Sequence, residues 1–282
     1  MNRPDPHSDF SEWIGRSTSA SDVITQRMAR SLSAVLDRDE LFQFDDDVAP
    51  YGIHWCLCPV IAKRSDLRPD GHPHKSDILP PVPMPHRMFA GSQSDFIQPL
   101  HVGDKITRIS TLKQITRKEG RSGPLCFLQV AHEYFTERGV ALKEAQDIVL
   151  RTTRAAPSAP ERAIGIPTSA QRRESTIDSI RLFQYSALTF NSHRIHLDRA
   201  YAVEQEHLVG LIVQSPLLAT MLLQFAASLK NSACPTSFGF RSTSPLLEGE
   251  TVTLIATETS GGISLQAIGE TNGVCMTANA RW

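Results

Sequence analysis

The sequence predicts an α+β protein in which an antiparallel β-sheet wraps around a buried helix, and it predicts this unit twice. Three observations carry the prediction: two groups of β-rich segments separated by a linker, one long helix that is apolar nearly all round, and a short motif present in both halves. With 282 residues, 40% of them hydrophobic, the chain has enough apolar material for one large domain or two of ordinary size.

The N-terminal half begins with a predicted helix and continues with a long irregular segment. Apolar residues at Ile24, Met28 and Leu32 recur at helical spacing, so residues 19–37 are expected to form an amphipathic surface helix. Residues 49–86 contain eight prolines, which predicts an irregular segment. Segments of this length inside a compact domain are usually functional or mobile, so a lid over a site and an ordinary wrap-around connection both stay open.

Strand patterns follow in the middle of the chain. From residue 89 to 151, β-branched and aromatic residues alternate in part with polar ones, and the runs RKEGRSG and ERG interrupt them as turns. This pattern predicts an antiparallel meander. The stretch 155–173 is rich in Ala, Pro and Ser and is predicted to be a linker.

The C-terminal half contains the strongest helix signal in the sequence. Ser215 is expected to cap this helix and Pro216 to take its first helical position, before the run LLATMLLQFAASLK. Because the run is apolar nearly all round, the helix should be buried. Further β-rich segments follow from residue 236 to the end of the chain.

A short motif indicates that the two halves are copies. Residues 99–107 and 245–253 both have the form P-L-x-x-G-[DE]-x-[IV]-T, and each precedes a β-rich run. A sheet wrapped around a helix, present twice, is the double hot-dog arrangement. We therefore expect two antiparallel sheets, each around a central helix, with residues 1–160 as the N-terminal repeat and 161–282 as the C-terminal repeat.

Composition excludes several classes of protein. A formal net charge of −1 gives no overall field that would attract nucleic acid. No apolar window is long enough to span a membrane, and the first residues lack the features of a signal or transit peptide, so a soluble cytoplasmic protein is expected. Five scattered cysteines are typical of reduced thiols, and the pair Cys56 and Cys58 makes a poor metal clip without a second pair.

The densest polar cluster lies about 20 residues before the buried helix. Asn191, His193, Arg194, His196 and Asp198 fall within eight residues. A neutral imidazole can accept or donate a proton near pH 7, and an asparagine can orient a water molecule. Two other interpretations stay open: a solvated polar loop, and a metal site built from the His-x-x-His-x-Asp pattern.

The run YSALTFNSHRIHLDRAYA, residues 185–202, resembles the signature of the MaoC-like, R-specific enoyl-CoA hydratase family. It is most similar to the branch that contains hydroxyacyl-thioester dehydratases and the itaconyl-CoA and mesaconyl-C4-CoA hydratases. The segments RPDGHP, LPPVPMPHRMFAG, PLHVGD and RKEGRSGPL resemble the N-terminal repeat of that branch, so the resemblance covers about residues 10–282. It implies that the N-terminal repeat shapes the substrate cleft without catalysing and that the C-terminal repeat carries the chemistry.

The resemblance assigns roles to individual residues. His196 stands at the catalytic histidine of the family, His193 at its asparagine, and Asn191 at its catalytic aspartate. Since a carboxamide cannot act as a base, proton transfer should fall to His196, assisted by His193, while Asn191 holds water or substrate. Ser215, at a position where relatives have glycine, is expected to donate its backbone N–H to the thioester oxygen.

The same resemblance suggests where the substrate binds. Arg194 and Arg87 are candidates for pairing with a free acyl carboxylate, although Arg194 could instead form a salt bridge that orients its loop. Arg117, Lys118 and Arg121 are candidates for the CoA phosphates, although charged turns are usually only solvated. No metal or redox cofactor is expected, because CoA is itself part of the substrate.

We therefore expect a hydratase that converts itaconyl-CoA or mesaconyl-C4-CoA to citramalyl-CoA. Three alternatives stay open: a 3-hydroxyacyl-thioester dehydratase, a thioesterase with the same fold, and a catalytically silent acyl-CoA-binding protein. The substitutions at Asn191, Gln214 and Ser215 motivate the last of these. The partner is expected to be an acyl-CoA, with neither nucleic acid nor membrane, and the sequence leaves a homodimer open.

Overall fold

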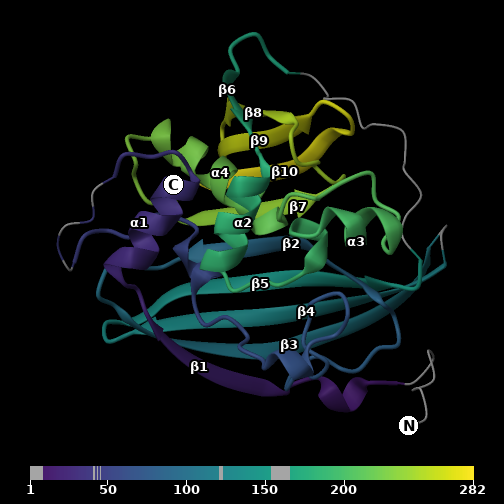
Figure 1. Ribbon diagram of the computed structural model, residues 1–282. Helices are drawn as coiled ribbons and strands as arrows, with labels where there is room; N and C mark the ends of the chain where they lie inside the picture. The colour runs from purple at the N-terminus through teal and green to yellow at the C-terminus, as the bar shows by residue number, and fades with distance from the viewer. Residues whose placement is uncertain (1–8, 41, 43, 45, 121–122, 154–165) are drawn as a thin grey trace.

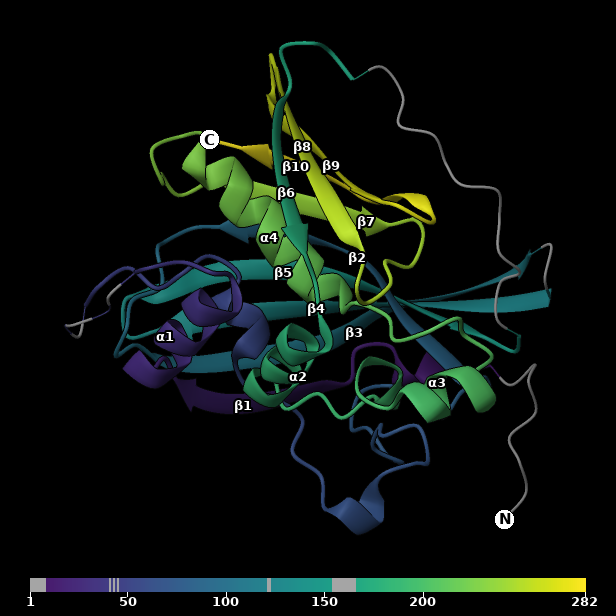
Figure 2. The same cartoon turned by 45° about the horizontal axis from the view of Figure 1, so that its top comes forward.

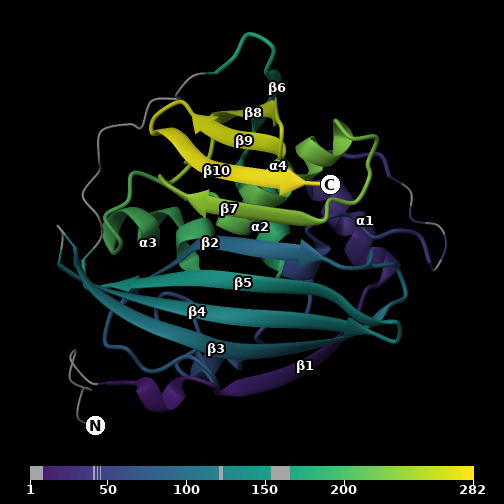
Figure 3. The same ribbon diagram turned by 180° about the vertical axis from the view of Figure 1, so that it is seen from behind.

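The computed structural model describes residues 9–40, 42, 44, 46–120, 123–153 and 166–282. In these residues ten strands form one continuous antiparallel sheet, in the order β1-β3-β4-β5-β2-β7-β10-β9-β8-β6 (Figures 1 and 3). The strands are β1 (Ser17–Val23), β2 (His86–Phe96), β3 (Lys105–Gly120), β4 (Gly123–Thr136), β5 (Gly139–Arg151), β6 (Gln171–Thr176), β7 (Ser237–Ser242), β8 (Thr251–Thr259), β9 (Gly262–Gly269) and β10 (Gly273–Arg281).

The strand order is symmetric about the β2–β7 pair. The first five strands run 1-3-4-5-2 and the last five run 7-10-9-8-6, which is the same order reversed. The two copies of the sequence motif form equivalent turns before β3 and β8. Gly103 and Gly249 both adopt positive φ, and their N–H groups donate to Ile24 and Ile177, which precede the first helix of each half. The α+β double hot-dog fold predicted from the sequence is confirmed.

One detail of that prediction is wrong, because the two sheets are not separate. Strand β2 pairs with β7 over residues 91–95 and 237–241, so the edge of each repeat satisfies the backbone groups of the other. The predicted boundary between residues 160 and 161 lies outside the described residues. The predicted linker at 155–173 ends in part of a strand, since β6 begins at Gln171.

The four α-helices of the described residues lie on one face of the sheet (Figure 2). The helix predicted at 19–37 is shorter than expected: its first part is β1, and the helix α1 (Gln26–Val35) starts after the cap Thr25. The helix begins after Thr25 and not earlier for two reasons. The Thr25 hydroxyl accepts the N–H of Met28, and the residues before Thr25 form β1, which pairs with β3. The other helices are α2 (Ser179–Leu188), α3 (Arg199–Glu204) and α4 (Ser215–Ser228).

Helix α4 is the centre of the C-terminal repeat, as predicted. Eleven consecutive residues, Leu217 to Ala227, are buried, and they pack against β7, β8, β9 and β10. The corresponding place in the N-terminal repeat holds only the short 3-10 helix η2 (Ile53–Cys56). The expectation of one central helix in each repeat is therefore wrong for the N-terminal repeat, whose proline-rich segment cannot continue a helix.

The remaining predictions about the chain concern membranes and cysteines. None of the helices in the described part of the chain is both long and apolar enough to cross a membrane. All five cysteines are free, and four of them are buried.

Candidate active site

Short-range hydrogen bonds shape the loop that carries the predicted histidines. After α2 ends, the side-chain oxygen of Asn191 accepts the N–H of His193 at 3.1 Å. The 3-10 helix η4 (Arg194–His196) follows, and Asp198 caps α3 by accepting the N–H of Tyr201 at 3.0 Å. These local bonds turn His193 and His196 inward, and both are buried. Asn191 therefore holds the loop, a role that the sequence did not indicate.

His196 has the geometry of a neutral base. Its Nδ1 lies 2.6 Å from the carbonyl oxygen of Ile212, so Nδ1–H donates to that carbonyl and Nε2 keeps its lone pair. Burial lowers the pKa of His196 to about 4; the Ile212 hydrogen bond opposes this shift and the nearby His72 adds to it. At neutral pH the ring is therefore unprotonated and can accept a proton.

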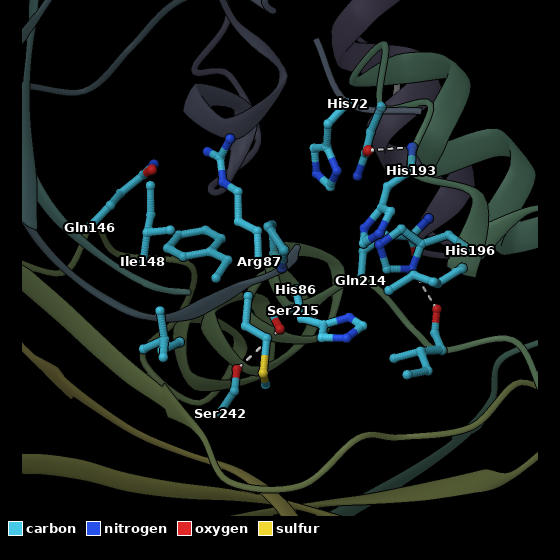
Figure 4. Close-up of a pocket in the computed structure, with 18 of the residues that line it drawn as sticks. His72, His86, Arg87, Gln146, Ile148, His193, His196, Gln214, Ser215 and Ser242 are labelled. Atoms are coloured by element: carbon cyan, nitrogen blue, oxygen red, sulfur yellow. Dashed lines mark hydrogen bonds between the residues drawn. The ribbon is translucent and has the colours of Figure 1, made fainter. Parts of the chain in front are cut away.

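A histidine from the N-terminal repeat completes the cluster. The ring centroid of His72 lies 4.1 Å from that of His193, which in turn lies 5.3 Å from that of His196. Figure 4 shows the three rings gathered on one side of a cavity. Sequence reasoning assigned His72 no role. Its only local signal was the run Asp-Gly-His at a turn within the long proline-rich segment, which does not say where that turn docks.

Asp70 holds His72 in place. Its Oδ2 lies 3.3 Å from Nδ1 of His72, and its Oδ1 accepts the backbone N–H of the same residue at 2.9 Å. Burial alone would raise the pKa of Asp70, but the hydrogen bonds from His72 and the charge of Arg68 outweigh it and hold the pKa well below its usual range. Asp70 is therefore a carboxylate at neutral pH.

The N-terminus of α4 opens onto the same cavity. Gln214, and not Ser215, is the N-cap; Ser215 is the first helical residue. The reason is that the buried Gln214 side chain donates to Leu182 O at 3.0 Å and Ser186 Oγ at 2.9 Å, which ties the start of α4 to α2. The first N–H groups of a helix have no partner within it and sit at the positive end of its dipole. Ser215 lines the cavity at this helix start, and its role as an oxyanion donor stays a prediction.

The cavity itself is large and is formed by both repeats. It has a volume of about 2670 Å³ and is lined by the three histidines, the first turn of α4 and the inner face of β2 to β5. Among the described residues, no group of three or more His, Cys, Asp or Glu side chains is placed to hold a metal ion. Asp198, the third ligand that a metal site built from the His-x-x-His-x-Asp pattern would need, instead forms an ion pair with Arg194.

Arg87 faces the histidines from the other side of the cavity (Figure 4). It lies at the start of β2, and protein surrounds its guanidinium, yet the side chain is exposed to the cavity. This enclosure, and the charge of Arg68, lower its pKa, although an arginine still keeps its charge at neutral pH. Among the residues that the structure describes, none accepts a hydrogen bond from Arg87 or forms an ion pair with it. Arg87 thus presents its guanidinium to the cavity, and the nearby carboxylate of Asp70, which forms no ion pair with it among the described residues, only partly opposes the lowering of its pKa.

The other predicted arginines and lysines have different surroundings. Arg194 forms the salt bridge with Asp198, 2.7 Å between Nη2 and Oδ2, and also donates to Pro69 O, so it orients its loop and does not line the cavity. Lys118 lines the cavity near the β3–β4 hairpin. The Arg117 guanidinium lies over the ring of Phe10, outside the cavity lining. Arg121 lies outside the described residues.

Comparisons with known proteins agree with this geometry. Residues 52–248 match the family described as hydroxyacyl-thioester dehydratase type 2. The chain is 36% identical to a mesaconyl-C(4)-CoA hydratase of Chloroflexus aurantiacus over 96% of this chain and 97% of that protein. Among solved structures, a MaoC-like dehydratase superposes with a TM-score of 0.74 at 12% identity, covering 95% and 98% of the two chains. A Mycobacterium tuberculosis protein described as a double hotdog fold superposes with a TM-score of 0.59 at 12% identity, covering 95% and 96%.

Proposed function

Because the chain belongs to the hydroxyacyl-thioester dehydratase type 2 family and is an acyl-CoA hydro-lyase, we propose that it hydrates a short unsaturated acyl-CoA that carries a free carboxylate. The substrates proposed are mesaconyl-C4-CoA and itaconyl-CoA, with citramalyl-CoA as the product. The observation that carries the proposal is the meeting of a neutral imidazole, His196, with the N-terminus of α4 in one cavity.

The chemistry needs a base and a site for negative charge. In mesaconyl-C4-CoA the C=C bond joins Cα and Cβ and is conjugated with the thioester; as the water oxygen bonds to Cβ, a proton of the water passes to Nε2 of His196. The electron pair of the C=C bond then moves toward the thioester oxygen, which gains negative charge. The Ser215 N–H and the dipole of α4 can stabilise that charge. A proton delivered to Cα completes the addition, and dehydration is the same sequence reversed.

The position of Arg87 favours a substrate that carries a carboxylate. A guanidinium that is exposed to the cavity and forms no ion pair among the described residues can pair with an anionic ligand. A planar guanidinium also matches a carboxylate with two parallel hydrogen bonds. Arg87 lies across the cavity from the histidines, which leaves room for an acyl group between them.

We also propose that the reaction uses no metal or redox cofactor. Water addition needs only proton transfer and stabilisation of the thioester oxygen, and side chains and a backbone N–H can supply both. CoA enters as part of the substrate.

Loss of enoyl-thioester absorbance tests the function. Purified protein is assayed with mesaconyl-C4-CoA, itaconyl-CoA and crotonyl-CoA, together with the variant His196→Ala, and a thiol-reactive dye records any free CoA. We expect consumption of a dicarboxylic acyl-CoA without release of thiol, and its loss in the variant. Thiol release would indicate a thioesterase instead, and tight binding without turnover would indicate a silent acyl-CoA-binding protein.

A second variant tests the substrate class. Arg87→Ala should raise KM by about 10-fold or more for a dicarboxylic acyl-CoA, as expected for a lost charge-assisted hydrogen bond of about 1.5–3 kcal/mol, and change it little for crotonyl-CoA. Arg194→Ala is the matched control, since Arg194 does not line the cavity. Equal changes on both substrates would remove the carboxylate-binding role, and a wild-type preference for crotonyl-CoA would favour a general 3-hydroxyacyl-thioester dehydratase.

A further inference from the structure

The signature loop carries two imidazoles, His193 and His196, but no carboxylate that lines the cavity. His196 can accept a proton from water, but the proton that reaches Cα must come from another group. Asn191 stands where the resemblance expects a carboxylate, and its side-chain oxygen is occupied by the N–H of His193. A carboxamide has no proton to transfer at neutral pH. An imidazole with a carboxylate partner for its charged form must therefore come from elsewhere in the chain.

His72, with Asp70 beside it, is one such imidazole. Its ring lines the cavity on the same side as His193 and His196, and its side chain is 22% exposed, so a substrate can touch it. Nδ1 faces Asp70, which leaves Nε2 as the other ring nitrogen. The carboxylate can compensate the positive charge of an imidazolium and hold the ring in one orientation, as in other acid–histidine pairs.

The loop that carries His72 is firmly attached to the signature loop. Ser192 Oγ donates to Gly71 O at 2.6 Å, and the Arg194 N–H donates to Asp70 O at 2.9 Å. Gly71 has a φ of +94°, and a Cβ there would collide with the backbone oxygen of Ser192. This close approach is possible only for glycine, so the backbone itself fixes the position of His72 relative to His193.

We propose that Asp70 and His72 of the N-terminal repeat form the second half of the catalytic machinery, with His72 as the acid that protonates Cα and Asp70 as the residue that positions it. The step balances. Water gives a proton to His196 and its oxygen to Cβ, the C=C electron pair forms the enolate, and that pair takes the proton of the His72 imidazolium to form the Cα–H bond. His72 is left neutral and His196 protonated, and a proton returns from His196 to His72 through cavity water before the next turnover.

This inference rests on the proposed hydratase function and changes the expectation for the N-terminal repeat. The resemblance implied that this repeat only shapes the cleft. With His72 as a catalytic residue, the active site is shared, and each repeat supplies one imidazole. Such a site cannot operate in either repeat alone.

Steady-state kinetics of three variants test the proposal. His72→Gln should lower kcat by about 10²–10⁴-fold, the usual contribution of a general acid, with little change in KM. Asp70→Asn should lower kcat by about 10-fold or more, because the ring loses the partner of its charged form. Exogenous imidazole should restore part of the activity of His72→Ala, which a purely structural role would not allow. His74→Gln, two residues along the same loop, is the matched control and should behave as wild type.

Each outcome decides the matter. Unchanged kcat in His72→Gln, while His196→Ala is inactive, would overturn the role of His72 and leave the hydratase function standing. Loss of activity in His72→Ala that imidazole does not restore, with an equal loss in His74→Gln, would indicate a disturbed loop and would also overturn it. A lowered melting temperature of the His72 variants would likewise indicate a disturbed loop and count against the role of His72. A wild-type protein that hydrates none of the three acyl-CoAs would overturn both proposals.

Discussion

The two repeats share one strand order but fill their centres in opposite ways. In the C-terminal repeat the sheet wraps around the fourteen residues of α4, eleven of which are buried. In the N-terminal repeat the same place holds the four residues of η2 and a buried polar group, the carboxylate of Glu144. Its oxygens accept hydrogen bonds from Trp55, Ser92, Tyr134 and Gln146 at 2.6 to 3.4 Å. One repeat is thus centred on apolar packing and the other on hydrogen bonds.

The difference shows which parts of a duplicated fold can change while the strand pairing stays the same. The strand pairing and the two glycine turns are kept, because each one satisfies backbone groups that would otherwise be buried unpaired. The helix is not needed for that pairing. Its loss in the N-terminal repeat leaves a long irregular segment, and that segment reaches the C-terminal repeat with Asp70 and His72. The repeat that lost its helix is thereby free to contribute to the site of the other.

Replacing Glu144 should give the largest effect on stability. Glu144→Leu removes an acceptor that four donors share in the buried centre, of which Tyr134 has a second acceptor, the His54 carbonyl; we expect unfolding to become easier by about 3–5 kcal/mol. The matched change in the C-terminal repeat, Leu222→Ala in α4, should cost about 2–5 kcal/mol through a cavity. Urea denaturation of both variants measures the comparison. A neutral or stabilising Glu144→Leu would mean that the N-terminal repeat does not depend on its polar centre.

Removing one backbone N–H at the start of α4 should give the next effect, on catalysis. Ser215→Pro keeps the helix, since proline suits its first position and Gln214 already has the extended backbone, φ −63° and ψ 129°, that a following proline requires. We expect kcat to fall by about 10²–10³-fold, as for other lost oxyanion donors. Ser215→Ala keeps the N–H and should stay within a few-fold of wild type. Equal losses in the two variants would assign the effect to the hydroxyl group instead.

The junction between the repeats can be tested with two glycines of similar backbone. Gly71 (φ +94°) lies against Ser192 of the other repeat, whereas Gly249 (φ +87°) has open space around it. Gly249→Ala should cost about 1 kcal/mol for the left-handed backbone alone. Gly71→Ala should cost more, about 1–3 kcal/mol, and should also lower kcat because the loops must separate. Equal stability and full activity in both variants would show that the junction is not constrained.

Acid should weaken both repeats through buried histidines, His54 and His132 in the N-terminal repeat and His196 in the C-terminal repeat. Burial lowers the pKa of His54 to about 4, as it does that of His196, below the value of about 6.5 for an exposed histidine. Between these values the unfolded chain binds more protons, so the stabilisation is complete above about pH 6.5 and is lost as the pH falls toward 4. His54 and His196 should each remove about 1.4 kcal/mol per pH unit in that window.

The substitution His54→Phe should reduce this slope, and the remaining histidine contribution should then come from His132 and His196, whose pKa values burial also lowers. Melting temperatures between pH 7 and pH 5 measure it. A slope that does not change with the substitution would show that His54 is not responsible.

Local patterns determined much of the molecule. The apolar run of α4, the strands of the central meander and the two P-L-x-x-G motifs follow from residue spacing and from turn chemistry, which act between neighbours in the chain. The residues of the signature loop were found in the same way, because Asn191, His193 and His196 lie within six positions. Even so, the pattern alone did not show that Asn191 serves the loop.

Only the tertiary structure decided which distant segments meet. The pairing of β2 with β7 joins strands more than 140 residues apart, and the contact of Gly71 with Ser192 spans 121 positions. No periodicity encodes such contacts, since they depend on how two packed repeats fit against each other. The same holds for Arg87, whose place on the cavity wall follows from the packing of the repeats and not from its sequence neighbours. The sequence therefore specified the elements and half of the site, and packing between the repeats supplied the other half.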